Sequence, residues 1–261
     1  MLARSGLFAA ICVALITAGA AAIADPSSVG YEYRRVAATD VHVVTVNLND
    51  PDVAVTLVVA RDGIGSAEPF ASIMRRSRPD AAITGTFFGV ECLLPIGNLV
   101  LDGRLLSPVA TGTTLAITRG NEAVLLPTRA NQAMDWSGYS AALFAGPTLV
   151  KDGRYAVDPA AEGFHDRGHY RPARRTALGI RPNHKLLLVA VARPVTLTRM
   201  AAIMKALGAR HAFALDGGTS AALHYRGHTI VRPGRRLTHV IAVYANGRPS
   251  VVAQAPHPRS G

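Results

Sequence analysis

Short apolar runs separated by turn sequences recur along most of this chain, and no other feature limits its fold as strongly. Turn sequences with strand-forming residues on at least one side lie at 102–103, 119–122, 152–153 and 181–184. Two of them are Asp-Gly, a pair that favours tight β-hairpins. The apolar runs 41–48 and 53–59 flank the polar turn 49–52 and are expected to form a further hairpin. The pattern predicts a sheet-rich protein.

Two segments have helical character instead, and the first of them is 67–76. In the second, Thr196 or Thr198 can cap a helix with apolar residues at helical spacing, and Gly208 can end it. A strand over 211–215 follows at once. With 49% hydrophobic and 17% charged residues, the 261-residue chain can bury one substantial core. We therefore expect a single α+β domain with a mixed, mostly antiparallel β-sheet and a few packing helices.

The N-terminus has the pattern of a cleavable export signal. Residues 1–24 carry one early arginine, a continuous apolar run and an Ala-rich end. An uncleaved membrane anchor is the alternative, because the apolar stretch approaches spanning length. Residues 25–80 are expected to supply N-terminal strands and a helix of the same domain, and 247–261 a polar tail. We expect an exported protein, periplasmic or extracellular, with at most peripheral membrane contact.

Cysteine is scarce in the chain. Of the two cysteines, Cys12 lies in the expected signal, so Cys92 stays alone in the mature protein and an internal disulfide is excluded. An isolated thiol between apolar neighbours is more often buried than nucleophilic, and burial is expected here.

The formal net charge of +11, with a pI near 10.5, indicates an anionic partner. The basic residues are spread widely and are not concentrated in a tail. Because export is expected, anionic envelope polymers, phosphorylated glycans or lipid head groups are better candidates than nucleic acid. The charge indicates a class of partner but no reaction.

The segment most suggestive of chemistry is 215–220, Leu-Asp-Gly-Gly-Thr-Ser, directly after the expected strand. Its glycines, Gly217 and Gly218, permit close approach of a ligand to the backbone, and Thr219 and Ser220 supply hydroxyls. Asp216 could act as a base, a nucleophile or an orienting group. It could equally be a structural aspartate that closes a tight turn.

The order of several motifs resembles the phosphodiester glycosidase family, which includes the mannose-6-phosphate uncovering enzyme. The similar segments are 83–88, 95–103, 145–153, 174–179, 215–218 and 236–240. Each is weak alone, but their shared order is fairly specific. The resemblance covers roughly 81 to 244, so 81–246 is expected to be a phosphodiester glycosidase-like core. Thr84 and Thr219 depart from the family, which usually has asparagine and a small residue at these positions.

The resemblance implies hydrolysis of a sugar-1-phosphodiester, with Asp216 catalytic. Cationic side chains can then neutralise the phosphate leaving group, and Arg175 and Arg236 are the candidates, with Thr176 as a hydroxyl donor. Thr84, Gly85 and the 217–220 segment are expected to contact substrate. A second carboxylate is harder to choose, and Glu91 is the candidate, although it could as easily be exposed.

A metal site is the less favoured use of the long, glycine-rich loop 158–175. His165, Asp166 and His169 could bind a divalent ion only if this loop formed a helical turn, so no metal and no cofactor are expected. Phosphate-loop, nucleophile-elbow and paired-cysteine motifs are absent from the sequence.

Taken with the resemblance, these features predict a secreted hydrolase that cleaves the bond between an anomeric carbon and a phosphate oxygen. The expected substrate is an anionic, phosphate-containing glycan or glycolipid. Two alternatives stay open: a non-catalytic basic envelope protein that binds anionic polysaccharide, and a phosphodiesterase. The sequence does not define the oligomeric state.

Overall fold

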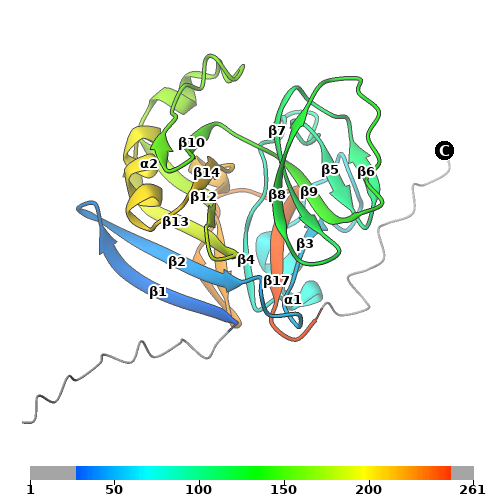
Figure 1. The fold of residues 1–261 in the computed structure, drawn as a ribbon, viewed down its shortest axis with the longest axis horizontal. Coiled ribbons are helices and arrows are strands. Elements are labelled where there is room, and N and C mark those ends of the chain that lie inside the picture. The colour runs from blue at the N-terminus through cyan, green and yellow to red at the C-terminus, as the bar shows by residue number, and fades with distance from the viewer. Residues whose placement is uncertain (1–27, 248–261) are drawn as a thin grey trace, which may run out of the picture.

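The computed structural model describes residues 28–247 and contains three β-sheets and two α-helices (Figure 1). The expected signal, 1–24, and nearly all of the expected tail, 247–261, lie outside the described residues. All strand pairs within the described residues are antiparallel, which confirms the expected mostly antiparallel α+β fold. No helix of residues 28–247 has the length and apolar character needed to cross a bilayer.

Each sheet draws strands from distant parts of the chain. In spatial order, the first sheet contains β1 (Val29–Val36), β2 (Thr39–Asn47), β13 (Lys185–Val195), β12 (Ala173–Arg181), β14 (His211–Ala214), β10 (Thr148–Lys151) and β11 (Arg154–Tyr155). The second contains β16 (His228–Val231), β15 (Leu223–Tyr225), β4 (Ala81–Thr84), β17 (His239–Tyr244) and β3 (Ala54–Val59). The third contains β6 (Arg104–Ser107), β5 (Leu99–Leu101), β9 (Tyr139–Ala145), β7 (Gly112–Thr118) and β8 (Ala123–Thr128).

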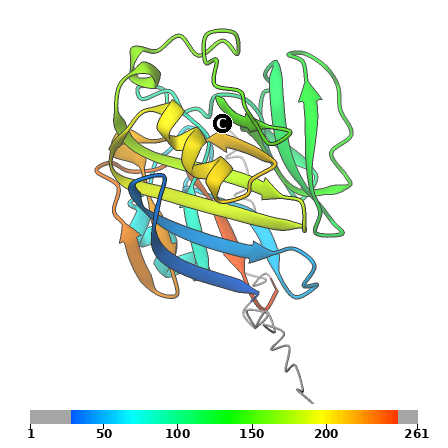
Figure 2. The ribbon, with the colours of Figure 1, turned by 60° about the vertical axis from the view of Figure 1, so that its left-hand side comes forward.

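The core lies between the sheets, and the helices cover two outer faces. The largest apolar cluster takes side chains from all three sheets, including Val46, Ile83 and Leu143. Helix α2 (Leu197–Ala206) packs on the first sheet, as Figure 2 shows, and α1 (Phe70–Ser77) packs on the second. Burial of these apolar faces is the main stabilising contribution to both helices.

The local signals for α2 are confirmed. Thr196 caps the helix, since its side chain accepts a hydrogen bond from the backbone N–H of Arg199 at 3.1 Å. Gly208 follows the last turn with φ +81°, a conformation that favours glycine. The helix connects β13 to β14, which both flank β12 and are therefore parallel to each other.

The four hairpins predicted from their turns are confirmed: β5–β6, β7–β8, β10–β11 and β12–β13. The hairpin predicted over 41–59 is wrong. Both of its strands exist, but β2 lies between β1 and β13 in the first sheet, whereas β3 pairs with β17 in the second. Since β2 already has a neighbour on each side, its hydrogen-bonding edges are satisfied and the turn carries the chain into another sheet.

Candidate active site

The loop after β14 is fixed where the first and second sheets meet. The backbone N–H of Leu215 donates to the carbonyl of Thr176 on β12 at 3.0 Å, and that of Asp216 donates to the carbonyl of Gly85, just beyond β4, at 3.1 Å. The hydroxyl of Thr176 donates to the carbonyl of Asp216 at 2.8 Å. Asp216 is therefore held by both sheets through its own main chain.

The two glycines give this loop a shape that side chains would prevent. A Cβ at Gly217 would lie 2.7 Å from the carbonyl oxygen of Arg174, which is too close for any other residue. Gly218 has φ +57°, and the space beside it is open. The turn closes with a bond from the Ser220 N–H to the Gly217 carbonyl at 2.9 Å. The backbone can thus approach a ligand closely at this point.

A cavity of about 360 Å³ opens over this loop. One part of its wall is apolar and contains Phe87, Phe88, Val90, Ile96 and Phe164. The polar part contains Asp166, His169, Arg175, Asp216, Ser220 and Arg235, together with the 217–219 backbone. An apolar wall facing a few polar groups is typical of a small-molecule site, and aromatic faces suit the apolar face of a sugar ring.

Asp216 is the most perturbed carboxyl group in this cavity. Burial raises its pKa to about 6. A hydrogen bond from Ser220, the positive charge of Arg235 and the backbone N–H of Gly217 act in the opposite direction, because each favours the carboxylate. A carboxyl group that titrates near neutral pH suits proton transfer. The placement supports a functional reading of Asp216 over a turn-closing one.

A neutral histidine stands behind the site. His239 on β17 is fully buried, and burial lowers its pKa to about 4. Its Nε2 accepts the N–H of Thr86 at 3.0 Å, and its Nδ1 lies 2.8 Å from the hydroxyl of Thr238. The ring occupies the space that a Cβ at Gly85 would need. His239 thereby positions the turn whose carbonyl, at Gly85, accepts the Asp216 N–H.

Arg175 lines the cavity, but most of its side-chain nitrogens already donate hydrogen bonds to backbone carbonyls. It is buried, which lowers its pKa, and its Nη2 donates to the carbonyls of Gly168, His169 and Arg171 at 3.1, 3.2 and 2.6 Å. Its Nε donates to Val195 at 3.3 Å. The side chain holds the loop before β12 over the cavity, so its phosphate contact stays a proposal that depends on its remaining nitrogen.

The second predicted arginine, Arg236, lines two neighbouring hollows and is not among the residues that line the Asp216 cavity. Its neighbour Arg235 lines the cavity instead, with its guanidinium 5.9 Å from the centre of the Phe88 ring. The chain bends at Gly234 and Arg235, so the sequence motif does not say which of the two arginines reaches the site. Sequence analysis therefore missed Arg235 by one position.

Glu91 and Cys92 lie in a surface turn beside the cavity and are both exposed. The turn is closed by hydrogen bonds between Gly89 and the main chain of Leu93 and Leu94 at 2.8 and 2.9 Å. Because these bonds hold the turn without a core contact, the expectation that Cys92 is buried is wrong. Glu91 is not among the cavity residues, and its catalytic role stays a prediction.

Thr84 is buried within β4, where its N–H donates to the carbonyl of Ala222 at 3.3 Å, and it does not line the cavity. Gly85 and Thr176 support the cavity floor from behind. The predicted residues that do line the cavity are Arg175, Asp216, Gly217, Gly218, Thr219 and Ser220.

His169 is the histidine of the long loop that reaches the cavity, whereas His165 is exposed. Its ring meets Phe87 and Phe164 edge-on, at centroid distances of 5.0 and 5.3 Å. Its Nδ1 is buried without a hydrogen-bond partner, and burial lowers the pKa of the ring, which disfavours its charged form. Within residues 28–247, no three His, Cys, Asp or Glu side chains are grouped as metal ligands.

The fold and this site together have the form of a phosphodiester glycosidase. The phosphodiester glycosidase family matches residues 77–244, more than half of the chain, and the chain belongs to that family. No curated protein sequence matches it significantly.

Solved structures of other proteins share the fold. A hypothetical protein from Synechocystis has a TM-score of 0.71 at 18% identity, with 83% of this chain and 62% of that one covered. The auto-inhibited catalytic domain of zebrafish N-acetylglucosamine-1-phosphodiester alpha-N-acetylglucosaminidase has a TM-score of 0.64 at 18% identity, covering 84% and 82%. A protein of Burkholderia pseudomallei K96243 described as exported has a TM-score of 0.60 at 15% identity, covering 78% and 74%.

Proposed function

We propose that this protein is an exported hydrolase that cleaves sugar-1-phosphodiesters at the bond between the anomeric carbon and the phosphate oxygen. The observation that carries the proposal is Asp216, a carboxyl group with a pKa near 6 that shares a cavity with Arg235 and an aromatic wall. Family membership supplies the reaction class, and the export signal and basic charge agree with an anionic envelope substrate.

In the proposed reaction, the sugar lies against the aromatic wall and the phosphate faces Arg235. The bond from the anomeric carbon breaks, and its electron pair leaves with the phosphate oxygen as a phosphomonoester. Because Arg235 neutralises that charge, less help is needed from a protonated acid. A water oxygen forms the new bond to carbon, and Asp216 takes its proton or stabilises the positive charge on the sugar.

His169 and the loop main chain bind the parts of the substrate that do not react. The side chain of His169 lines the cavity and can contact the sugar. Gly218, with open space beside it, lets the substrate contact the backbone. Arg175 holds the loop that carries His169 and closes one side of the cavity.

The test is incubation of the mature protein with aryl and alkyl sugar-1-phosphate diesters, with free sugar and phosphomonoester measured separately. Matched release by wild type, lowered by at least about a hundredfold in Asp216→Asn, is the expected result. Asp52→Asn, the same substitution at an exposed carboxyl group outside the cavity, is the control. Release of alcohol with sugar-1-phosphate would instead identify a phosphodiesterase, and absence of turnover across several sugars would favour the non-catalytic binding protein.

A further inference from the structure

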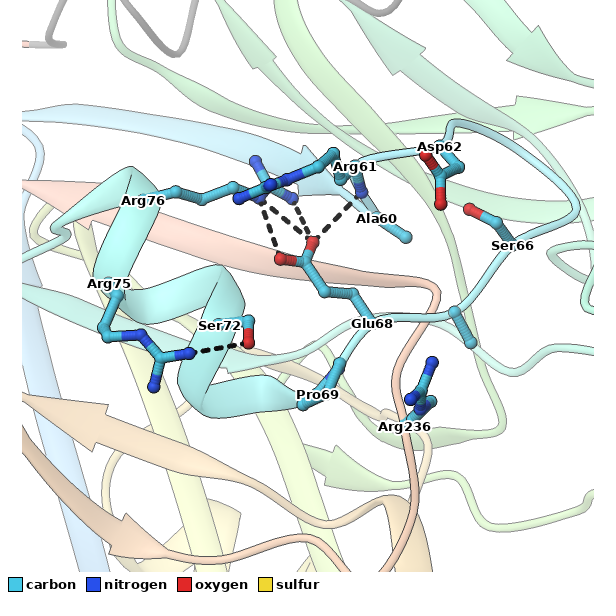
Figure 3. A pocket seen from close by; sticks show the side chains of 11 residues that line it. Ala60, Arg61, Asp62, Ser66, Glu68, Pro69, Ser72, Arg75, Arg76 and Arg236 are labelled. Carbon is cyan, nitrogen blue, oxygen red and sulfur yellow. Dashed lines mark hydrogen bonds and ion pairs between the residues drawn. The ribbon is translucent and has the colours of Figure 1, made fainter.

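A second hollow, of about 530 Å³, lies outside the catalytic cavity and is lined by several arginines (Figure 3). Arg75 and Arg76 come from α1, Arg61 from the loop after β3, and Arg236 from the segment that leads into β17. We call it the arginine hollow. The proposed reaction does not require the arginines of this hollow, because Arg235 already supplies a positive charge in the catalytic cavity.

A third hollow, of about 450 Å³, lies between the arginine hollow and the catalytic cavity and shares lining residues with each. Pro69 and Arg236 line both the arginine hollow and this third one, and Arg235 lines both the third one and the catalytic cavity. Arg232 adds another cation to the third hollow. Three adjoining hollows with arginines in their walls thus extend from Asp216 to α1, and we call them together the groove.

The segment 232–237, which carries three of these arginines, is fixed at three points. Its Gly234 N–H donates to the carbonyl of Thr219 at 2.7 Å, and the carbonyl of Arg232 accepts from the Arg174 side chain at 2.7 Å. Leu237 pairs with Glu68 through two backbone bonds of 2.9 and 3.0 Å. The positions of the cations relative to the catalytic loop are therefore set by the fold.

The charge of the arginine hollow is only partly neutralised internally. Glu68, a buried carboxylate, pairs with Arg76 at 2.8 Å and accepts the backbone N–H of Arg61 at 3.0 Å. Arg76 is thereby committed. The exposed arginines of the hollow face one further acidic side chain, Asp62, and within residues 28–247 none of them forms an ion pair. Net positive charge remains.

We propose that this groove binds successive phosphates of a polymer, so that the substrate is a linear glycan with repeating phosphodiester linkages. One linkage occupies the catalytic cavity, and the flanking phosphates contact the arginines of the other two hollows. The inference rests on the proposed function. A single lipid head group would fill one hollow only, whereas three adjoining hollows with cations match charges repeated along a chain.

The binding test needs no knowledge of the sugar. Linear polyphosphate of about 15 phosphates is the probe, and inorganic phosphate is its monomeric control. The variant is Arg61→Glu with Arg75→Glu. Both side chains are exposed, and the hydrogen bond from Arg75 to Ser72 is the only side-chain bond that either makes. Arg154→Glu, the same substitution at one exposed arginine on β11 outside the groove, is the control.

Wild type is expected to bind polyphosphate far more tightly than phosphate, with affinity falling steeply as salt rises. The double variant should lose at least about tenfold in affinity, and Arg154→Glu less than about twofold. If the double variant and Arg154→Glu lost the same affinity for polyphosphate, the proposal that the groove binds phosphates would be overturned. The proposal would also be overturned if wild type bound phosphatidylglycerol vesicles but not polyphosphate, since the arginines would then serve to bind a membrane surface.

A catalytic arm separates the two proposals. The kcat/KM for a sugar-1-phosphate polymer, divided by that for the matching monomeric alkyl diester, should fall about tenfold or more in the double variant and stay constant in Arg154→Glu. A constant ratio in both would overturn the polymer inference while leaving the hydrolase intact. If wild type cleaved neither compound, the proposed function would fail, and the polyphosphate result would still decide whether the groove binds a polyanion.

Discussion

Replacing Asp216 by Asn is expected to stabilise the folded protein at pH 8 while it abolishes activity. Burial raises the pKa of this carboxyl group to about 6 from its usual value of 3.8, so the folded state prefers the protonated form. The free energy of unfolding is then highest below pH 4, falls as pH rises from about 4 to about 6, and levels off above that. Asn carries no charge and escapes this penalty.

The size of the effect follows from that pKa. Each pKa unit corresponds to about 1.4 kcal/mol, so holding the carboxylate ionised in the fold costs about 3 kcal/mol relative to the unfolded chain. This cost already includes the favourable contacts of the carboxylate with Ser220, Arg235 and Gly217, so the gain is reduced only where the hydrogen bonds of Asn differ from those of a protonated carboxyl group. We expect a net stabilisation of about 1–3 kcal/mol at pH 8.

Denaturant unfolding at pH 8 and pH 4 measures this difference, and thermal unfolding should show about 2–4 °C for each kcal/mol. The curves of wild type and Asp216→Asn should converge at pH 4, where the wild-type carboxyl group becomes largely protonated. Asp52→Asn, at an exposed carboxyl group outside the cavity, reports the effect of the substitution itself. A variant no more stable than wild type at pH 8, or a stability difference independent of pH, would show that burial does not govern this carboxyl group.

The proposed ionised role of Asp216 predicts that kcat rises with pH, with a midpoint near 6, in a pH–rate profile; a rate that falls through this range would indicate a general acid instead. Arg235→Gln should shift that midpoint to higher pH, because the charge of Arg235 lowers the pKa of Asp216, and an unmoved midpoint would contradict their coupling. Gly85→Ala should cost about 1–3 kcal/mol in denaturant unfolding, because the new Cβ would overlap the ring of His239. Gly138→Ala, where the added Cβ meets no atom within 4 Å, is its control, and equal losses would refute the steric argument.

Features decided by neighbouring residues could be predicted from the sequence, and features decided by distant ones could not. The Asp102-Gly103 turn specifies its own hairpin, since both residues adopt the positive φ values that this pair favours. The second partner of β2, β13, and the partner of β3, β17, lie more than a hundred residues away and left no local signal. The β1–β2 hairpin turns at Ala37-Ala38, with φ of 46° and 58° but none of the usual turn residues.

The site divides in the same way. Residues 216–220 are contiguous in sequence, so one motif was enough to predict that all of them lie at the cavity. The part of Arg235 depends on how the chain bends at 234–235, and that of His169 depends on how a long loop folds back over Phe87. The fixed neutral state of His239 depends on burial between distant strands, which no motif encodes.

The hydrogen bonds of the loop after β14 place the candidate site at the junction between the first and second sheets. Asp216 receives its position from the carbonyl of Gly85 at the end of β4 and from Thr176 on β12, so neither sheet alone defines where the carboxyl group lies. A ligand bound there would fasten the two sheets together. Conversely, a substitution deep in either sheet that lets them slide by a fraction of an ångström should abolish turnover before circular dichroism detects any loss of structure. We therefore expect the rate of the proposed reaction to respond to small shifts between the two sheets more sensitively than a spectroscopic measure of secondary structure does.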